Sequence, residues 1–329
     1  MKKLFLALVA VAAILSSCSK DDSLTGVSKS QVSFTVSAPE MTTRYGDGHQ
    51  ATTLYYGVYD PVEGGLVKGL SVLDPAVKGT FKGEQEVTLH LVEGRTYSII
   101  FYAQNAAESP YLIDWENQIF KIDEAYIDGD TVNKNLLSNK ETYDAFYAYV
   151  PNIKVESGKA INQTVELKRP FAQLNILTDD LDAAKKAAID IDKTEVTVEN
   201  VGTSMRLTDG NVLTAQKLTF AMNDMATGKY TVKGGKAYDY LAMNYLLAGG
   251  KNAVNVTFKM NDSTIAEGQE DKAILTRTYS SVYIERNHRT NIYGSIITNP
   301  ATFNVVIEPN FIDSPNSDNN YNGDEKKND

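Results

Sequence analysis

Hydrophobic and polar residues alternate with a period of two along much of the chain. The pattern begins at QVSFTV, where Val32, Phe34 and Val36 share one face, and it stops at Pro39. It returns in later segments that are bounded by glycine, asparagine or aspartate. This period predicts strands with one buried face, and the frequent turn residues predict antiparallel neighbours. Further strands of the first half are predicted at 52–60, 86–94, 95–104 and 144–155.

A proline interrupts the longest alternating run, INQTVELKRPFAQLNILT at residues 161–178. Because proline cannot donate to a strand ladder, we expect the strand to bend or to change sheets at Pro170. The pattern therefore predicts a domain boundary near Lys168. Beyond it, LDAAKKAAID (181–190) predicts one short helix. Alternation predicts further strands at 195–201, 212–222, 239–247, 252–260, 281–287, 290–297 and 302–309.

Two connections carry expectations of their own. The glycine-rich AGGK (248–251) predicts a hairpin that pairs the strand before it with the strand after it. Residues 106–139 lack regular alternation and are expected to form long connections around Trp115. The expected fold is all-β, with two tandem Greek-key β-sandwich domains of about seven strands each and one short helix in the second.

The first residues have the pattern of an export signal. Lys2 and Lys3 precede a run of about a dozen apolar residues, which is too short to span a bilayer as a mature helix. Small residues then lead to Cys18, the only cysteine, in an order that resembles the lipobox of bacterial lipoproteins, whose cysteine is lipidated and becomes the new N-terminus. A free thiol beside an ordinary cleavage site is the alternative. The expected organisation is a leader at 1–17, a lipidated flexible tether at 18–30, sandwiches at 31–167 and 168–312, and a disordered polar tail at 313–329.

The acidic composition limits the expected partners. Removing residues 1–17 takes away two lysines, so the formal net charge of −10 becomes −12. Such a surface repels nucleic acid and anionic lipid headgroups. A lone cysteine cannot form an intramolecular disulfide, so stability must come from the core. No later apolar stretch approaches the length of a membrane-spanning helix, which leaves a lipid on Cys18 as the expected membrane attachment.

The sequence contains no recognisable catalytic motif, and we expect no enzyme activity, cofactor or metal. His49, His90 and His288 lie far apart, and His90 falls on the solvent side of its predicted strand. With no cysteine beyond the lipobox, thiol catalysis is excluded. The acidic stretch from Asp123 to Asp130 has carboxylates two residues apart that could hold calcium, but a solvated acidic loop is the simpler interpretation.

Two other clusters each have a functional and a structural interpretation. RNHRTN (286–291) could bind an anion, but Arg286 and Arg289 are expected to pair with acidic residues across strands. A group of aromatic residues could form a platform for sugar rings, although packing in the core and on the sheet is the commoner use of tyrosine. The aromatic group is Tyr55, Tyr56, Tyr59 and Trp115.

Several of these stretches together resemble the fimbrillin-like family of lipoproteins that build type V pili. The likeness is carried by the lipobox, the two β-sandwich halves, KRPFAQLNI (168–176), DYLAMNYLL (239–247) and VYIERNHRTNIYGSIIT (282–298), and it covers nearly all of the mature chain. The resemblance implies two transthyretin-like sandwiches and export to the cell surface as an outer-membrane lipoprotein. It further implies that an arginine-specific protease removes the first strand, and that a strand of another subunit fills the vacated groove.

The resemblance assigns candidate residues of this chain to each step. Removing an edge strand would leave unpaired backbone groups and an apolar groove, which is a template for β-augmentation. The first arginine could instead be an exposed loop residue without a role, and the last predicted strand could stay in its own sandwich. The candidates are Val32, Phe34 and Val36 for the displaced strand, Arg44 and Tyr45 for proteolytic maturation, and Phe303, Val305 and Ile307 for a donor strand.

The sequence therefore predicts a structural or accessory subunit of a cell-surface pilus, or fimbrium. Its expected partners are other pilus subunits, the outer-membrane lipid, and host proteins or glycans in adhesion. A subunit that keeps its last strand in place would be an anchor or a tip. The alternative is a monomeric surface lipoprotein that binds glycans through exposed aromatic residues.

Overall fold

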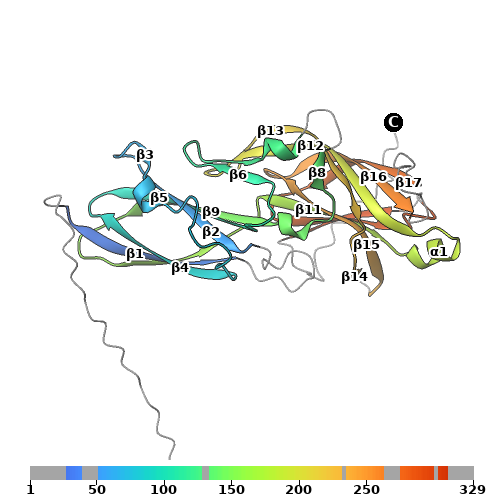
Figure 1. The fold of residues 1–329 in the computed structure, drawn as a ribbon, viewed down its shortest axis with the longest axis horizontal. Helices are drawn as coiled ribbons and strands as arrows, with labels where there is room; N and C mark the ends of the chain where they lie inside the picture. The colour runs from blue at the N-terminus through green and yellow to red at the C-terminus, as the bar shows by residue number, and fades with distance from the viewer. Residues whose placement is uncertain are drawn as a thin grey trace, which may run out of the picture.

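The computed structural model describes residues 27–38, 51–127, 133–231, 235–262, 275–299 and 303–309. Most of the regular structure in these residues is β-strand, as the alternating pattern predicts. The strands form two β-sandwiches that follow one another along the long axis of the molecule (Figure 1). The single α-helix of the described residues, α1 (Leu181–Lys186), lies in the second sandwich, as expected. No helix in this part of the chain is long and apolar enough to cross a membrane.

The first sandwich consists of two sheets that share one hydrophobic core. One sheet has the strand order β10-β1-β4 and the other has the order β3-β2-β5-β9, which gives the expected seven strands. Inward side chains of both sheets meet in the core, as the rings of Phe34 and Phe101 do at 5.3 Å. The strands are β1 (Lys29–Ser37), β2 (Thr53–Asp60), β3 (Gly65–Leu66), β4 (Glu84–Val92), β5 (Thr96–Gln104), β9 (Ala145–Lys154) and β10 (Ile161–Glu166).

The second sandwich is larger than the sequence predicts, with twelve strands in one hydrogen-bonded sheet. A single bridge between Gly202 and Leu247 joins two groups of strands, and both groups contribute to one core. The central path runs β17-β16-β12-β15-β11-β18-β19. These strands are β11 (Phe171–Thr178), β12 (Ile191–Arg206), β15 (Ala237–Leu247), β16 (Asn252–Asp262), β17 (Leu275–Ile284), β18 (His288–Gly294) and β19 (Phe303–Pro309). The branches are β6 (Tyr111–Asp114), β7 (Ile119–Ile122), β8 (Asn133–Leu137), β13 (Val212–Asp224) and β14 (Lys229–Thr231).

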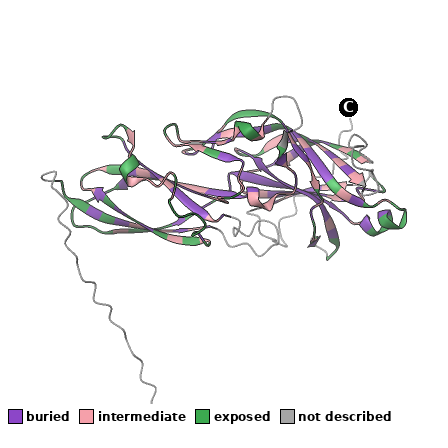
Figure 2. Ribbon diagram, in the orientation of Figure 1, coloured by how far each residue is buried: buried purple, intermediate pink, exposed green. Residues whose placement is uncertain are grey.

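Pro170 marks the passage from one sandwich to the other. β10 ends before it and pairs with β1 in the first sandwich, whereas β11 begins after it and lies between β15 and β18 in the second. The predicted change of sheet at this proline is therefore confirmed. In Figure 2 buried residues run through the middle of both sandwiches. β11 is buried along its whole length, with β15 paired to one edge and β18 to the other.

The stretch 106–139 contains strands that sequence reasoning missed. β6 pairs with β7, β7 pairs with β12, and β8 pairs with β13, so the second sandwich also uses residues that the sequence places in the first domain. These strands have only four or five residues, which is too short for a period of two to stand out. A short 3-10 helix, η2 (Glu124–Tyr126), follows β7.

The predicted hairpin at AGGK is wrong. β15 pairs with β11, β14 and, at one bridge, β12, while β16 pairs with β12 and β17. Residues 248–251 therefore carry the chain from one group of strands to the other instead of turning it back on its neighbour. Both flanking strands contribute side chains to the same core from different groups, so two strands joined by a glycine-rich turn look locally like a hairpin.

Candidate assembly site

β1 occupies the centre of its sheet, and this corrects the expectation of an edge strand. It pairs antiparallel with β4 along its whole length, from Lys29 opposite Val92 to Ser37 opposite Glu84. On its other edge it pairs in parallel with β10, from Val32 beside Ile161 onward. A strand with neighbours on both edges leaves a slot, not a free edge, when it is removed.

The inward face of β1 is formed by the three apolar residues that the alternation singles out. Val32 and Val36 are fully buried and Phe34 is 1% exposed. They pack against the opposite sheet in the core of the first sandwich, where Phe34 contacts Phe101. Burial of three such side chains stabilises the strand in its slot by about 5 to 9 kcal/mol in total.

Polar contacts hold both ends of β1. At its start, the Ser30 hydroxyl donates to the Glu93 carboxylate at 2.7 Å, and the Glu93 amide donates to the Ser28 carbonyl at 3.0 Å. The Ser30 hydroxyl, followed by those of Ser157 and Ser28, donates to the ionised Glu93 carboxylate and lowers its pKa to about 2. At its end, the Leu167 amide donates to the Ser37 carbonyl at 2.7 Å. The next residues of the chain, including Arg44 and Tyr45, lie outside the described residues, as does Cys18.

β19, the candidate donor strand, lies in the second sandwich and is paired there. It pairs antiparallel with β18 and is the terminal strand of the sheet path. Val305 is buried in the core, and Phe303 packs edge-on against Tyr279 at 4.9 Å. In this structure β19 is therefore the last strand of its own sandwich, which is one of the two alternatives that the sequence allows.

A buried charged group fixes β19 to its neighbour. Glu308 stands directly opposite Arg289 in the β18–β19 register, with 3.6 Å between Oε2 and Nη1. The Tyr230 hydroxyl donates to the same carboxylate, and Arg289 Nε donates to the Gln173 side-chain oxygen at 3.0 Å. Both members of the ion pair are buried, so they hold the strand in a precise register. The expected cross-strand partner of Arg289 is confirmed.

Arg286, the other arginine of RNHRTN, has no carboxylate partner within the described residues, contrary to expectation. It donates to the Tyr147 hydroxyl at 3.2 Å and to the Gly210 carbonyl at 3.0 Å. Both acceptors come from neighbouring elements at the junction between the sandwiches, so this arginine ties elements together. His288 is half-buried beside it and contacts the Arg286 carbonyl through Nδ1. His90 is exposed, as the alternation predicts, and His49 lies outside the described residues.

The aromatic group proposed as a sugar platform is packed. Tyr55 and Tyr59 are 8% and 3% exposed, and the Tyr59 hydroxyl donates to the Trp115 carbonyl at 2.8 Å. The Trp115 ring lies so close to Gly57 that a Cβ there would meet it at 2.8 Å. These side chains lie in or against the core, which is the structural use that the sequence analysis favours. Tyr56 and Trp115 are half-buried and pack against the cores.

The described residues contain no group of three or more histidine, cysteine, aspartate or glutamate side chains that could hold a metal ion. Asp123 instead accepts a hydrogen bond from the Ala125 amide at the start of η2. Asp128 and Asp130, which complete the acidic stretch, lie outside the described residues.

Comparisons with known proteins give one family and a set of similar folds. The model of a family of unknown function (DUF6562) matches residues 25–323. No curated protein matches the chain. Among solved structures, the fimbrial anchor protein Mfa2 from Porphyromonas gingivalis is 12% identical with a TM-score of 0.44, over 85% of this chain and 97% of that one. The tip fimbrial protein Mfa3 from the same organism, with a C-terminal truncation, is 12% identical with a TM-score of 0.43, over 85% and 98%.

Proposed function

This chain belongs to the DUF6562 family of unknown function, and we propose that it is a subunit of a cell-surface pilus that assembles by exchange of β-strands between subunits. In this proposal the chain is exported as a lipoprotein and anchored in the outer membrane through Cys18. Its partners are other pilus subunits, and adhesion to host proteins or glycans is the role of the assembled fibre. The resemblance to fimbrillin-like lipoproteins supports each of these steps.

The observation that carries the proposal is the position of β1 between β4 and β10. If β1 leaves, two facing rows of backbone donors and acceptors lose their partners, and the pocket that holds Phe34 opens at the core. An unpaired slot of this kind binds an added strand through main-chain hydrogen bonds, while alternate side chains give specificity. A strand inserted in the slot can form main-chain hydrogen bonds with both β4 and β10, so it is held more firmly than a strand added at a free edge.

Arg44 is the proposed site at which β1 is separated from the rest of the chain. In the sequence it lies between the end of β1 and the start of β2, and it is the first arginine of the chain. Cleavage there would leave β1 attached to the lipidated tether and would give the remaining subunit a terminus at Tyr45. The cut chain then keeps all the remaining strands of the first sandwich, from β2 to β10.

β19 is the proposed donor, since within the described residues it is hydrogen-bonded on one edge only. Its release would have to break the Glu308–Arg289 pair and uncover Val305. A subunit in which β19 stays at home would accept a strand without offering one, which is the behaviour of an anchor or a tip.

Truncation tests the slot directly. A chain that begins at Tyr45 is compared with one that begins at Ser19, which keeps β1, on a denaturing gel without heating. We expect a ladder of polymers from the shorter chain and a single band from the longer one. A peptide with the sequence KSQVSFTVS of β1 should suppress the ladder by filling the slot, whereas the same peptide with Phe34→Asp should not. A shorter chain that stays monomeric, or polymers that ignore both peptides, would refute the proposal.

Maturation and lipidation are tested on protein from cells. The N-terminal sequence and intact mass of sheared protein should show a terminus at Tyr45, and Arg44→Ala should abolish it. Metabolic labelling with a palmitate analogue should mark the precursor and should be lost in Cys18→Ala. Protein that keeps a lipidated Cys18 throughout would show that β1 remains in place, and would limit the role to an anchor.

A further inference from the structure

β17 ends the central sheet path of the second sandwich, and its outer edge has little protection against pairing with another strand. Within the described residues it is paired on one edge only, to β16. Free edges of natural sheets are usually guarded by charged side chains, proline or bulges. β4 and β10, at the two ends of the three-stranded sheet, carry the exposed glutamates Glu84, Glu86 and Glu166. β17 contains no acidic residue, although the chain has a net charge of −10.

The one charged residue of β17, Arg277, does not guard the edge. Its Nε donates to the Ile296 carbonyl at 2.9 Å and its Nη2 to the Ile297 carbonyl at 3.0 Å. These carbonyls follow β18, so the guanidinium is held against the other group of strands. The side chains on the outer face of β17 are exposed and uncharged, and they are Thr276, Thr278 and Ser280.

A row of threonines crosses the outer face of the sheet and ends at this edge. Thr219 of β13 stands opposite Thr197 of β12, with 2.9 Å between their hydroxyl oxygens. Thr197 stands opposite Thr257 of β16, which stands opposite Thr278 of β17. The first three side chains are half-buried and the last is exposed. Threonine pairs across strands stabilise a sheet, and Thr278 has such a partner on one side only within the described residues.

From these observations we infer that β17 pairs antiparallel with β17 of a second copy of this chain, across a two-fold axis at Thr278. The two threonine rows then join into one, with Thr278 opposite its own copy. Thr276 stands opposite Ser280 of the second copy, so the pairs on the outer face are polar and uncharged. The two sheets become one continuous sheet, and both edges gain partners for their backbone groups.

The neighbours of Thr278 decide where the axis lies. An axis at Arg277 would place this residue directly opposite its own copy, and like charges in that position destabilise a sheet. An axis at Tyr279 would bring a β-bulge close to the centre, since Ser281 has a φ of 55° and the β16–β17 register shifts there. The axis at Thr278 avoids the charge clash and leaves the bulge at the end of the paired segment.

The charge around the edge suits a copy of an acidic chain. Two such chains repel each other over most of their surfaces, so contact is favoured where the surface is neutral. Beside Thr276, β16 carries Lys259, whose charge is balanced by Glu195 at 2.9 Å. Beside the bulge lies the uncharged Asn255, which accepts a hydrogen bond from the Ser281 amide at 3.1 Å. The second copy therefore meets no unbalanced charge along the paired segment.

This contact is separate from the exchange of β1. Figure 1 shows β17 in the second sandwich, far from β1 in the first. The paired segment is short, so isolated chains should associate weakly and in proportion to their concentration. In a pilus, and here the inference rests on the proposed function, the contact would repeat along the fibre, and many weak contacts together would hold two fibres side by side.

Cysteine cross-linking tests the axis in the chain that begins at Ser19, because that chain contains no cysteine. Thr278→Cys places each thiol opposite its own copy, with Cα atoms roughly 4.5 to 5.5 Å apart, which suits a disulfide. We expect mild oxidation to give a disulfide-linked dimer. The matched control is Thr276→Cys, an exposed threonine of the same strand and face. Its thiols would be offset by roughly 13 Å along the strands, which is too far for a disulfide.

Sedimentation of the same chain without a cysteine measures the association itself. We expect a monomer–dimer equilibrium that shifts toward dimer as the concentration rises. Thr278→Glu puts two carboxylates on the axis and should raise the dissociation constant roughly tenfold or more. Thr88→Glu, the same change at an exposed position of β4, should leave it unchanged. Melting temperatures of both variants close to that of the parent chain would show that the fold is intact.

Each other outcome overturns the inference. A chain that stays monomeric at every concentration does not use this edge. Equal cross-linking of Thr276→Cys and Thr278→Cys would mean random collision or a different register. A dimer that survives Thr278→Glu, or that is lost in Thr88→Glu instead, would place the contact on another surface. Because β1 fills its slot in this chain, none of these results bears on strand exchange, and the two proposals can fail independently.

Discussion

Arg169 and Asp144 form an ion pair that is almost completely shielded from water, with exposures of 1% and 0% for the two side chains. Arg169 Nε lies 2.8 Å and 2.9 Å from the two carboxylate oxygens, and its guanidinium stands 4.5 Å from the centre of the Phe146 ring. Arg169 comes directly before Pro170, at the passage between the sandwiches, and Asp144 comes directly before β9. The pair therefore joins two crossings between the sandwiches, the one from β8 to β9 and the one from β10 to β11.

Removing one charge of this pair should destabilise the protein more than replacing both charges with uncharged side chains. Asp144→Asn leaves a buried guanidinium without its counter-charge, and Arg169→Met leaves a buried carboxylate, so each should lower the free energy of unfolding by about 3 to 5 kcal/mol. The double variant removes both charges and should lose clearly less than the sum of the two. Urea unfolding of all four chains gives the coupling energy. Costs that simply add would show that the two charges do not depend on each other.

Truncating the central side chain of β1 should destabilise the first sandwich. Phe34→Ala removes a ring that is 1% exposed and packs on Phe101, so we expect a loss of about 3 to 5 kcal/mol in free energy of unfolding. Gln31→Ala, at an exposed position of the same strand, should stay within about 0.5 kcal/mol of the parent. Denaturant unfolding measures both. Equal effects of the two substitutions would mean that β1 contributes little to the core.

The alternation of side chains was enough to predict β1, its buried face and most of the longer strands. Val32, Phe34 and Val36 share the core face because successive side chains of a strand point to opposite sides, which is a local property of the chain. The same reasoning correctly placed His90 in solvent. The proline rule predicted the change of sheet at Pro170, because the missing N–H is also local.

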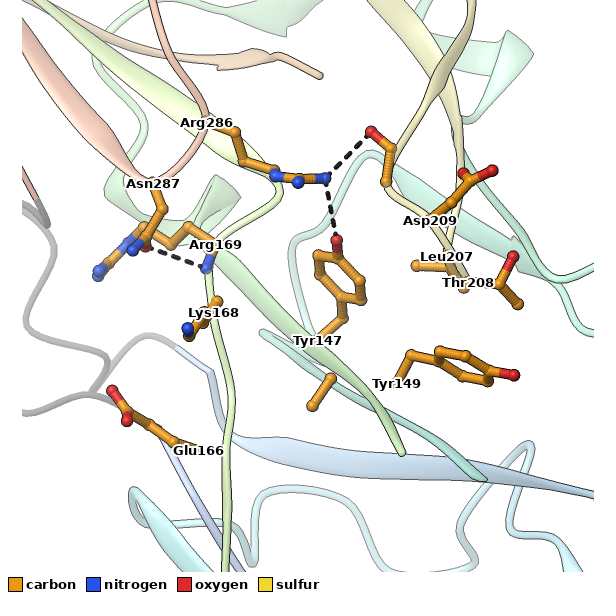
Figure 3. A pocket seen from close by; sticks show the side chains of 12 residues that line it. Tyr147, Tyr149, Glu166, Lys168, Arg169, Leu207, Thr208, Asp209, Arg286 and Asn287 are labelled. Atoms are coloured by element: carbon orange, nitrogen blue, oxygen red, sulfur yellow. Dashed lines mark hydrogen bonds between the residues drawn. The ribbon is translucent and has the colours of Figure 1, made fainter. Parts of the chain in front are cut away.

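Pairing between distant segments could not be predicted in this way. β1 sits at the centre of its sheet because β10, far along the chain, adds to its second edge, and no turn signal encodes that parallel contact. The sequence also gave no hint that β6, β7 and β8 belong to the larger sheet. The hydrogen bond from Arg286 to Tyr147 (Figure 3) was missed for the same reason, since the two residues come from distant segments that meet only in the folded chain.

A disulfide across β18 and β19 should show whether β19 acts as a donor. Tyr293 stands opposite Asn304 in the antiparallel register, where Cα atoms are roughly 4.5 to 5.5 Å apart, a separation that suits a disulfide. Tyr293→Cys with Asn304→Cys, placed in the chain that begins at Tyr45, introduces the only cysteines of that chain. We expect the oxidised form to stay monomeric and the reduced form to give the ladder. A ladder under both conditions would mean that another segment fills the slot.

The strength with which the first sandwich holds β1 should depend on pH through Glu93. Its pKa is lowered to about 2, chiefly because the Ser30 hydroxyl, followed by those of Ser157 and Ser28, donates to the ionised carboxylate. A carboxylate with a lowered pKa in the folded state adds stability above its unfolded pKa, near 4.5. That stability should fall as the pH drops from about 4.5 toward 2, where the folded form also takes up a proton.

Comparison of the parent chain with Glu93→Gln across this range isolates the contribution. The glutamine is neutral at every pH, so the parent should be the more stable of the two at pH 7, and the difference should shrink between pH 4.5 and pH 2. Urea midpoints at pH 7, 4.5, 3 and 2 measure the difference directly, and Glu86→Gln serves as a control at an exposed position of the neighbouring strand β4. A difference in stability between the two chains that stays constant with pH would mean that the charge of Glu93 does not cause it. A difference that grows toward low pH would contradict the role of its charge in holding Ser30 and the start of β1.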